Sequence, residues 1–175
     1  MSAHFLQPSV IADAKAHAIR EFPKESCGFV VAGTYHPCAN VAEEPHKFFR
    51  FIDDAYDMAL VTGALQAVLH SHPNGPAYPS ADDMRGQVAT GVPWGIIIAN
   101  DQMAADPIMW GDQLPIPELI GRAFVHGITD CYSLIRDYYR LEREIVIPEY
   151  PRSDSWWGAG EDLYSKGFAE AGFVP

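Results

Sequence analysis

A short apolar stretch that ends in two histidines, two positions apart, constrains the fold of this chain most strongly. Residues 66–69 are mostly apolar and favour a strand that leads directly into His70 and His72. Residues 73–76 then carry the Pro and Gly residues of a turn. Because alternate residues of a strand point to one face, the two imidazoles face the same point, with Cα atoms roughly 7 Å apart, and Ser71 faces away. The pattern predicts a strand with an imidazole pair at its exposed end.

A carboxylate in the next predicted element can complete a metal site. Residues 80–89 are expected to form a helix, and Asp83 lies in its first turn. Two neutral imidazoles and one carboxylate leave a tetrahedral Zn²⁺ with one open position, as a hydrolytic zinc site requires. A structural alternative is that Ser80 and Asp83 form only the capping box S-x-x-D/E. The two roles are compatible, because Ser80 can cap the helix while Asp83 turns toward a metal.

A hydrolytic zinc site also needs a general base, usually a carboxylate that is not itself a ligand. Glu25 is the candidate, because it lies just before the apolar residues 29–32, where a strand is expected to begin. Taken by itself, Glu25 is better explained as a solvated loop residue. The residue pattern alone therefore leaves its role open.

Together these residues resemble the signature of the MPN/JAMM metalloproteases, E…H-[ST]-H-P-x6-S-x-x-D. Every position is filled at the matching spacing, by Glu25, His70, Ser71, His72, Pro73, Ser80 and Asp83. The resemblance covers roughly residues 1–110. It implies an α/β (α+β) fold of the cytidine-deaminase-like type, with a mixed sheet flanked by helices.

The same resemblance implies roles for the residues of the signature. Zn²⁺ would be held by His70, His72 and Asp83, and Glu25 would polarise the attacking water. Ser80 would steady the oxyanion of the tetrahedral intermediate. Members of this family cleave peptide or isopeptide bonds, so the resemblance implies a peptide substrate.

A second resemblance lies further along the chain. Residues 127–139 resemble the start of an NlpC-type, papain-like cysteine peptidase, with Cys131 in the place of the nucleophile. The position is chemically reasonable, because a helix N-terminus lowers the pKa of a thiol. However, such a site needs a histidine after the cysteine, and none of the residues that follow Cys131 is a histidine. We therefore expect only the first part of such a domain, with Cys131 inert in this chain.

An MPN domain followed by an NlpC-type domain is the layout of a group of phage tail assembly proteins. The expected division is a metallopeptidase domain at 1–111, a proline-containing linker at 112–122 and a partial NlpC-type domain at 123–175. The resemblance implies phage tail proteins as partners and action in tail assembly or on peptidoglycan peptides. It implies the host cytoplasm during assembly, or the virion tail, as the location.

Two other functions are alternatives to the peptidase. The first is a structural tail component whose MPN fold binds a partner without catalysis; the complete signature argues against it. The second is a zinc deaminase, which needs H-x-E and P-C-x-x-C. Pro37 and Cys38 are not followed by the second cysteine, so this function is rejected.

Composition excludes further classes of function. The net charge of −11 argues against nucleic acid as a partner. The chain has no apolar run long enough to span a bilayer, and its first residues lack the layout of a signal peptide. Its three cysteines are scattered and form no CxxC, which argues against a disulfide framework and for a reducing compartment.

The remaining elements follow from periodicity and turn residues. A first helix is expected to be capped by Ser9 and stopped by Pro23. Asp53 is expected to start another helix, which Gly63 interrupts. Strands are expected at 29–32, 35–41, 47–51, 92–99 and 103–110, and later helices at 130–144 and 161–171.

Overall fold

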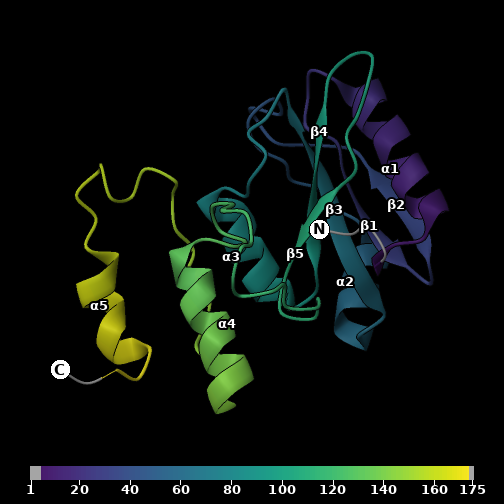
Figure 1. Ribbon diagram of the computed structural model, residues 1–175. Coiled ribbons are helices and arrows are strands. Elements are labelled where there is room, and N and C mark those ends of the chain that lie inside the picture. The colour runs from purple at the N-terminus through teal and green to yellow at the C-terminus, as the bar shows by residue number, and fades with distance from the viewer. Residues whose placement is uncertain (1–4, 174–175) are drawn as a thin grey trace. The chain divides into compact units, whose positions relative to one another are not determined.

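A computed structural model describes residues 5–173 of the chain (Figure 1). The chain divides into two compact units. The first consists of Met1–Tyr78 and Thr90–Pro115, and the second of Pro79–Ala89 and Ile116–Pro175.

The first unit is built on a five-stranded sheet in the order β2-β1-β3-β4-β5. The strands are β1 (Cys27–Val31), β2 (Thr34–Cys38), β3 (Leu65–Pro73), β4 (Trp94–Ala99) and β5 (Ile108–Trp110). Strands β3 and β4 are parallel, and the other neighbours are antiparallel. The predicted α/β class with a mixed sheet flanked by helices is confirmed.

Helix α1 (Pro8–Glu21) packs against one face of this sheet. It buries Val10, Ala14 and Ala18 in a core with residues from the strands. The expected cap at Ser9 is wrong, because the helix begins two residues earlier than this cap implies, and Gln7 is the N-cap residue. Pro8 occupies its first position, where the missing N–H costs nothing and the fixed φ favours a helix.

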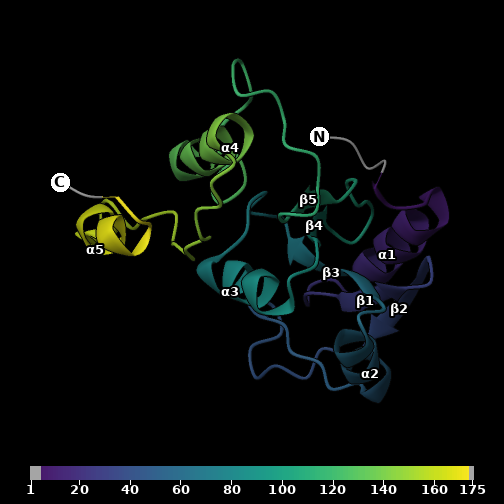
Figure 2. The ribbon, with the colours of Figure 1, turned by 90° about the horizontal axis from the view of Figure 1, so that it is seen from below.

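Helix α2 (Asp54–Thr62) lies on the opposite face of the sheet, as Figure 2 shows. As predicted, Asp53 caps it, accepting hydrogen bonds from two backbone amides of the first turn at 2.8 and 3.1 Å. Its Tyr56 ring packs edge-on against Phe29 of β1, with centroids 5.5 Å apart. Val30, the neighbour of Phe29, belongs to the core under α1. Adjacent strand residues point to opposite faces, so the two helices cover different faces.

The same alternation along β3 sets the direction of the histidines. Ala67 and Leu69 are part of the core under α1. His70 and His72 therefore point to the other face, two residues apart on one strand. Parallel pairing with β4, which begins Val68↔Trp94, holds this part of β3 on its second edge.

The predicted strands differ in extent from those of the structure. Residues 92–99 contain β4 and are almost fully buried, as the unbroken apolar run predicts. Residues 103–110 form a strand only over β5, with Ala104 bridged singly to Ala99. The strand predicted at 47–51 is wrong, because this segment has no regular secondary structure. Two of its backbone groups, the Phe48 carbonyl and the Arg50 amide, bond to the Asn40 side chain.

The second unit is helical. It contains nearly all of α3 (Ala81–Thr90), then α4 (Cys131–Arg143) and α5 (Leu163–Glu170). Asp130 caps α4 by accepting a hydrogen bond from the Ser133 amide at 3.0 Å. Among residues 5–173, no helix is both long and apolar enough to cross a membrane.

Candidate metal centre

Strand β3 brings the two imidazoles of the H-x-H pattern together. His70 is fully buried, and His72 is 6% exposed. Their Nε2 atoms lie 3.1 Å apart, so both rings direct the same nitrogen toward one point. The alternation of side chains along a strand predicted this convergence. The predicted exposure of the pair is wrong, because both histidines are buried.

The tautomer of His72 follows from its second nitrogen. Nδ1 lies 2.7 Å from the carbonyl oxygen of Pro76, which can only accept a hydrogen bond. Nδ1 therefore carries the proton, and Nε2 presents a lone pair toward His70. Such a hydrogen bond to the non-ligating nitrogen is typical of metal-binding histidines. Since two lone pairs at 3.1 Å repel each other, either a proton or a cation belongs between the rings.

Aromatic rings fix the orientation of His70. Phe49 stacks on its imidazole with centroids 4.6 Å apart. Trp94 and Trp110 meet the same ring edge-on, at 6.0 and 6.2 Å. These apolar neighbours exclude water from one side of the imidazole pair, and electrostatic interactions are stronger in such surroundings.

Asp83 has the capping role that the sequence predicted, in a geometry compatible with metal ligation. Its Oδ2 accepts hydrogen bonds from the Ser80 amide and the Ser80 hydroxyl, each at 2.7 Å. The Asp83 amide in turn donates to the Ser80 hydroxyl oxygen at 3.1 Å, which completes a capping box at the start of α3. Capping uses Oδ2 alone. The carboxylate has a second oxygen, so capping does not preclude metal ligation.

The two histidines and the aspartate form a group that could bind a metal. His70, His72 and Asp83 are all buried, and each offers one ligand atom within 4.8 Å of the others. Two imidazoles and a carboxylate suit Zn²⁺, which favours nitrogen and oxygen ligands and leaves a fourth position for substrate or water at hydrolytic sites.

Glu25, the predicted base, lies at the entrance to β1 and is 6% exposed. Antiparallel pairing places Cys27 of β1 across from His70 of β3. The same register continued by two residues places Glu25 across from His72. Its backbone amide donates to the Pro45 carbonyl at 2.6 Å. The reading of Glu25 as a solvated loop residue is wrong, because its side chain is buried.

Ser80 is exposed at the start of α3, and its hydroxyl donates to Asp83. This hydrogen bond orients the hydroxyl toward the carboxylate. A role for Ser80 at an oxyanion requires rotation of the hydroxyl away from Asp83.

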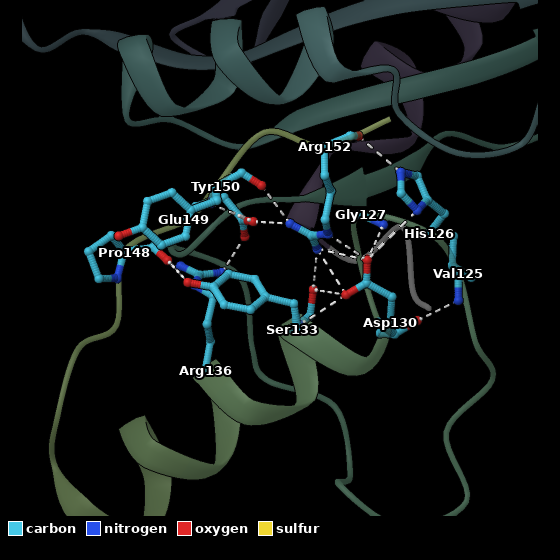
Figure 3. A network of polar contacts seen from close by, with 12 residues as sticks. Val125, His126, Gly127, Asp130, Ser133, Arg136, Pro148, Glu149, Tyr150 and Arg152 are labelled. Atoms are coloured by element: carbon cyan, nitrogen blue, oxygen red, sulfur yellow. Dashed lines mark hydrogen bonds and ion pairs between the residues drawn. The ribbon is translucent and has the colours of Figure 1, made fainter. Parts of the chain in front are cut away.

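Cys131 is the first residue of α4 and is exposed. It lines a cavity of about 630 Å³ in the second unit, together with Tyr132 and several other aromatic side chains. The preceding residue, Asp130, is the centre of the polar network in Figure 3. Arg152 donates to both of its carboxylate oxygens, at 2.8 and 2.9 Å.

This network shapes the chemistry next to Cys131. Burial alone would raise the pKa of Asp130, but the Arg152 guanidinium and hydrogen bonds from backbone amides hold it below its ordinary value. The nearest histidine in sequence, His126, places Nε2 3.1 Å from the Arg152 carbonyl and Nδ1 3.9 Å from Asp130. The contacts of His126 are therefore those of a structural residue.

Two features of the site were not predicted from the sequence. Phe49 was assigned to a strand, and Pro76 to a turn without a role. No local signal identifies which aromatic ring will stack on a histidine, or which carbonyl will accept from it. Both contacts depend on where the loops fold back against β3.

Two curated proteins are similar to this chain, and both are named tail tip assembly protein K. The protein of Escherichia phage N15 is 32% identical over 166 residues, which make up 90% of this chain and 66% of the relative. The protein of Escherichia phage lambda is 38% identical over 106 residues, or 61% of this chain and 49% of the relative. The alignments thus span less than two thirds of the first relative and about half of the second.

A solved structure of a protein from Desulfitobacterium hafniense is also similar, with 22% identity and a TM-score of 0.44. The similarity covers 62% of this chain and 84% of that one. The family comparison is more extensive. Residues 7–110 match Prok-JAB, the prokaryotic homologs of the JAB domain, and this range includes the imidazole pair, Asp83 and Glu25. Because the match extends over more than half of the sequence, the chain belongs to the Prok-JAB family.

Proposed function

We propose that this chain is a zinc-dependent peptidase of the MPN/JAMM type. The observation that carries the proposal is the convergence of the His70 and His72 Nε2 atoms, 3.1 Å apart and buried. Those two nitrogens and a carboxylate oxygen of Asp83 would hold the ion. A zinc ion held there would supply Lewis acidity to the carbonyl of the bond to be cleaved.

Glu25 is the proposed general base. Its buried carboxylate would take a proton from the attacking water and pass it to the departing amine. The register of β1 against β3 supports this role, because it places Glu25 beside the end of β3 that carries His72. Ser80 would rotate from Asp83 and donate its hydroxyl hydrogen to the oxyanion.

The relatives support a role in phage tails. Both are named tail tip assembly proteins, so we propose that this chain acts in tail assembly or on peptidoglycan peptides. Tail proteins would then be partners, in the host cytoplasm during assembly or in the virion tail. We further propose the division into domains at 1–111 and 123–175, joined by 112–122. The second domain would be NlpC-type, with Cys131 as an inert counterpart of the nucleophile.

The substitution Glu25→Gln tests the peptidase. It keeps the size of the side chain but removes the base, so zinc content should equal that of the wild type while hydrolysis falls by about 10²–10⁴-fold. Hydrolysis is followed by mass spectrometry on peptidoglycan fragments and on purified tail proteins. Equal turnover by the wild type and by Glu25→Gln would rule out the proposed base.

A structural role in tail assembly is the second candidate, and the names of the relatives favour it independently of catalysis. Complementation separates the two functions. A phage whose own copy is inactivated is supplied with the wild type or with Glu25→Gln. If infectious particles form equally well with both, the chain acts in assembly without hydrolysis. If only the wild type restores them, catalysis is required.

A further inference from the structure

The side-chain amide of Asn40 bonds to five backbone groups. Its Nδ2 lies 3.0 Å from the Glu25 carbonyl oxygen, 3.2 Å from that of Pro45 and 2.9 Å from that of Phe48. Its Oδ1 accepts from the Ala42 amide at 3.0 Å and from the Arg50 amide at 3.2 Å. All partners of the nitrogen are acceptors and all partners of the oxygen are donors, so the orientation of the amide is unambiguous.

These bonds replace a missing strand. Residues 39–53 form no helix or strand, and their backbone polar groups still need partners. The Asn40 side chain supplies a partner to four of them, and its fifth bond goes to the Glu25 carbonyl outside the loop. The Val41 amide adds a bond to the Arg50 carbonyl at 2.8 Å. The loop is thereby closed at its base, where it meets the start of β1.

Asn40 meets the proposed site at two places. At Glu25, both backbone polar groups are tied to this loop, the carbonyl to Asn40 and the amide to Pro45 at 2.6 Å. At Phe49, Asn40 bonds to the residue on either side, Phe48 and Arg50. The ring between these two anchors is the one that stacks on His70.

We infer that Asn40 is a positioning residue, which fixes the backbone of Glu25 and the ring of Phe49 relative to the imidazole pair. The role as regards catalysis rests on the proposed peptidase function. Asn40 touches neither the imidazoles nor the substrate in this scheme. It acts through the placement of the base, and a displacement of about 1 Å at a reacting group can cost about 100-fold in rate.

Asn40→Asp is the informative substitution. It keeps the shape and the acceptor oxygen that holds Ala42 and Arg50, but it places an oxygen against the three carbonyls. Asn100→Asp is the matched control. Asn100 also follows a strand, and its Oδ1 accepts two backbone amides, from Gln102 at 2.9 Å and Met103 at 2.8 Å, which an aspartate retains.

The full chain is assayed with zinc bound, and kcat and KM are measured separately. For Asn40→Asp, kcat should fall at least tenfold, with KM within about twofold and zinc stoichiometry unchanged. Asn100→Asp should have the same kcat, KM and zinc stoichiometry as the wild type. Loss of zinc together with loss of activity would indicate a general structural defect and overturn the inference. Unchanged kcat in Asn40→Asp would also overturn it.

Amide hydrogen exchange tests the inference without activity. In Asn40→Asp, the Glu25 amide should exchange at least tenfold faster, because its acceptor, the Pro45 carbonyl, loses the bond from Nδ2. The amides of β3 and β4 should keep their wild-type rates. If the wild type hydrolyses none of the substrates, the proposed function fails, and this exchange pattern alone decides the positioning of Glu25. Unchanged protection at the Glu25 amide would then overturn the inference. Faster exchange throughout the sheet would overturn it as well.

Discussion

Ser71, which separates the two histidines of β3, holds the backbone of Ser26 through two hydrogen bonds. The Ser26 amide donates to the Ser71 hydroxyl oxygen at 2.8 Å, and the Ser71 amide donates to the Ser26 carbonyl at 3.0 Å. Both residues are 1% exposed. The side chain that points away from the imidazoles therefore joins β3 to the segment that carries Glu25.

Replacement of Ser71 by alanine should lower the free energy of unfolding by about 1–3 kcal/mol. The reason is that the buried Ser26 amide would lose its acceptor. Urea unfolding followed by circular dichroism measures the change. Ser71→Thr keeps the hydroxyl, so its free energy of unfolding should fall by less than that of the alanine variant. An alanine variant as stable as the wild type would show that the bond contributes nothing.

His70→Ala should abolish stoichiometric zinc binding, because one of three candidate ligands is lost. Atomic emission on the dialysed chain measures the metal. His46 is exposed and outside the candidate group, so His46→Ala should bind as much zinc as the wild type. Zinc that persists in His70→Ala would mean that the ligand set is wrong.

Zinc should also stabilise the fold. A ligand that binds only the native state adds about 2.7 kcal/mol at a concentration 100-fold above its Kd. A thermal melt of the wild type should therefore shift upward on addition of zinc and return with a chelator. The melt of His72→Ala should not respond. An equal shift in both proteins would place the binding elsewhere.

Asp130 should contribute stability that depends on pH. Its pKa is lowered in the folded chain, so the contribution is complete above the unfolded value of about 3.8 and is lost as pH falls through the folded pKa. Asp130→Asn should cost about 3 kcal/mol at pH 7, because Arg152 would lose a buried partner. This loss of stability is at the low end of the range for broken buried ion pairs. The reason is that Arg152 keeps a second carboxylate partner, Glu149, at 2.5 Å.

Chemical denaturation at pH 7 and pH 3 measures this contribution. The difference in the free energy of unfolding between the wild type and Asp130→Asn should be smaller at pH 3 than at pH 7. Asp101 is exposed, and Asp101→Asn provides the control with the same change of charge. A gap that stays constant with pH would contradict the assignment.

Among the three thiols, Cys131 should be the one that reacts. Burial raises the pKa of Cys27 to about 12 and that of Cys38 to about 11, whereas Cys131 is exposed. Brief treatment with iodoacetamide at pH 8, followed by peptide mapping, should label Cys131 alone. Labelling of Cys27 in the folded chain would show that β1 opens.

The histidine pair could be predicted because neighbouring residues of one strand determine where its two rings point. A strand alternates its side chains, so an H-x-H at the end of an apolar run implies convergent rings. Asp83 follows within one turn of a capped helix, and the capping box itself is visible in the sequence. For these residues, neighbours in the chain determine the geometry.

The loop between β2 and α2 could not be predicted in the same way. Residues 47–51 have the composition of a strand but form none, and the Asn40 side chain bonds to the Phe48 carbonyl and the Arg50 amide. Asn40 is eight residues from Phe48 and ten from Arg50 in the sequence. Nothing in the sequence distinguishes Asn40 from an ordinary turn residue. The stacking of Phe49 on His70 could not be predicted either, because it depends on how this loop folds back against β3.

Strand β3 lies in the middle of the sheet. Both edges of this strand are hydrogen-bonded, to β1 and to β4, so fraying of an end strand leaves the spacing of the two rings unchanged. Entry and departure of an ion would then involve movement of the imidazole and Asp83 side chains, while the backbone of β3 stays paired.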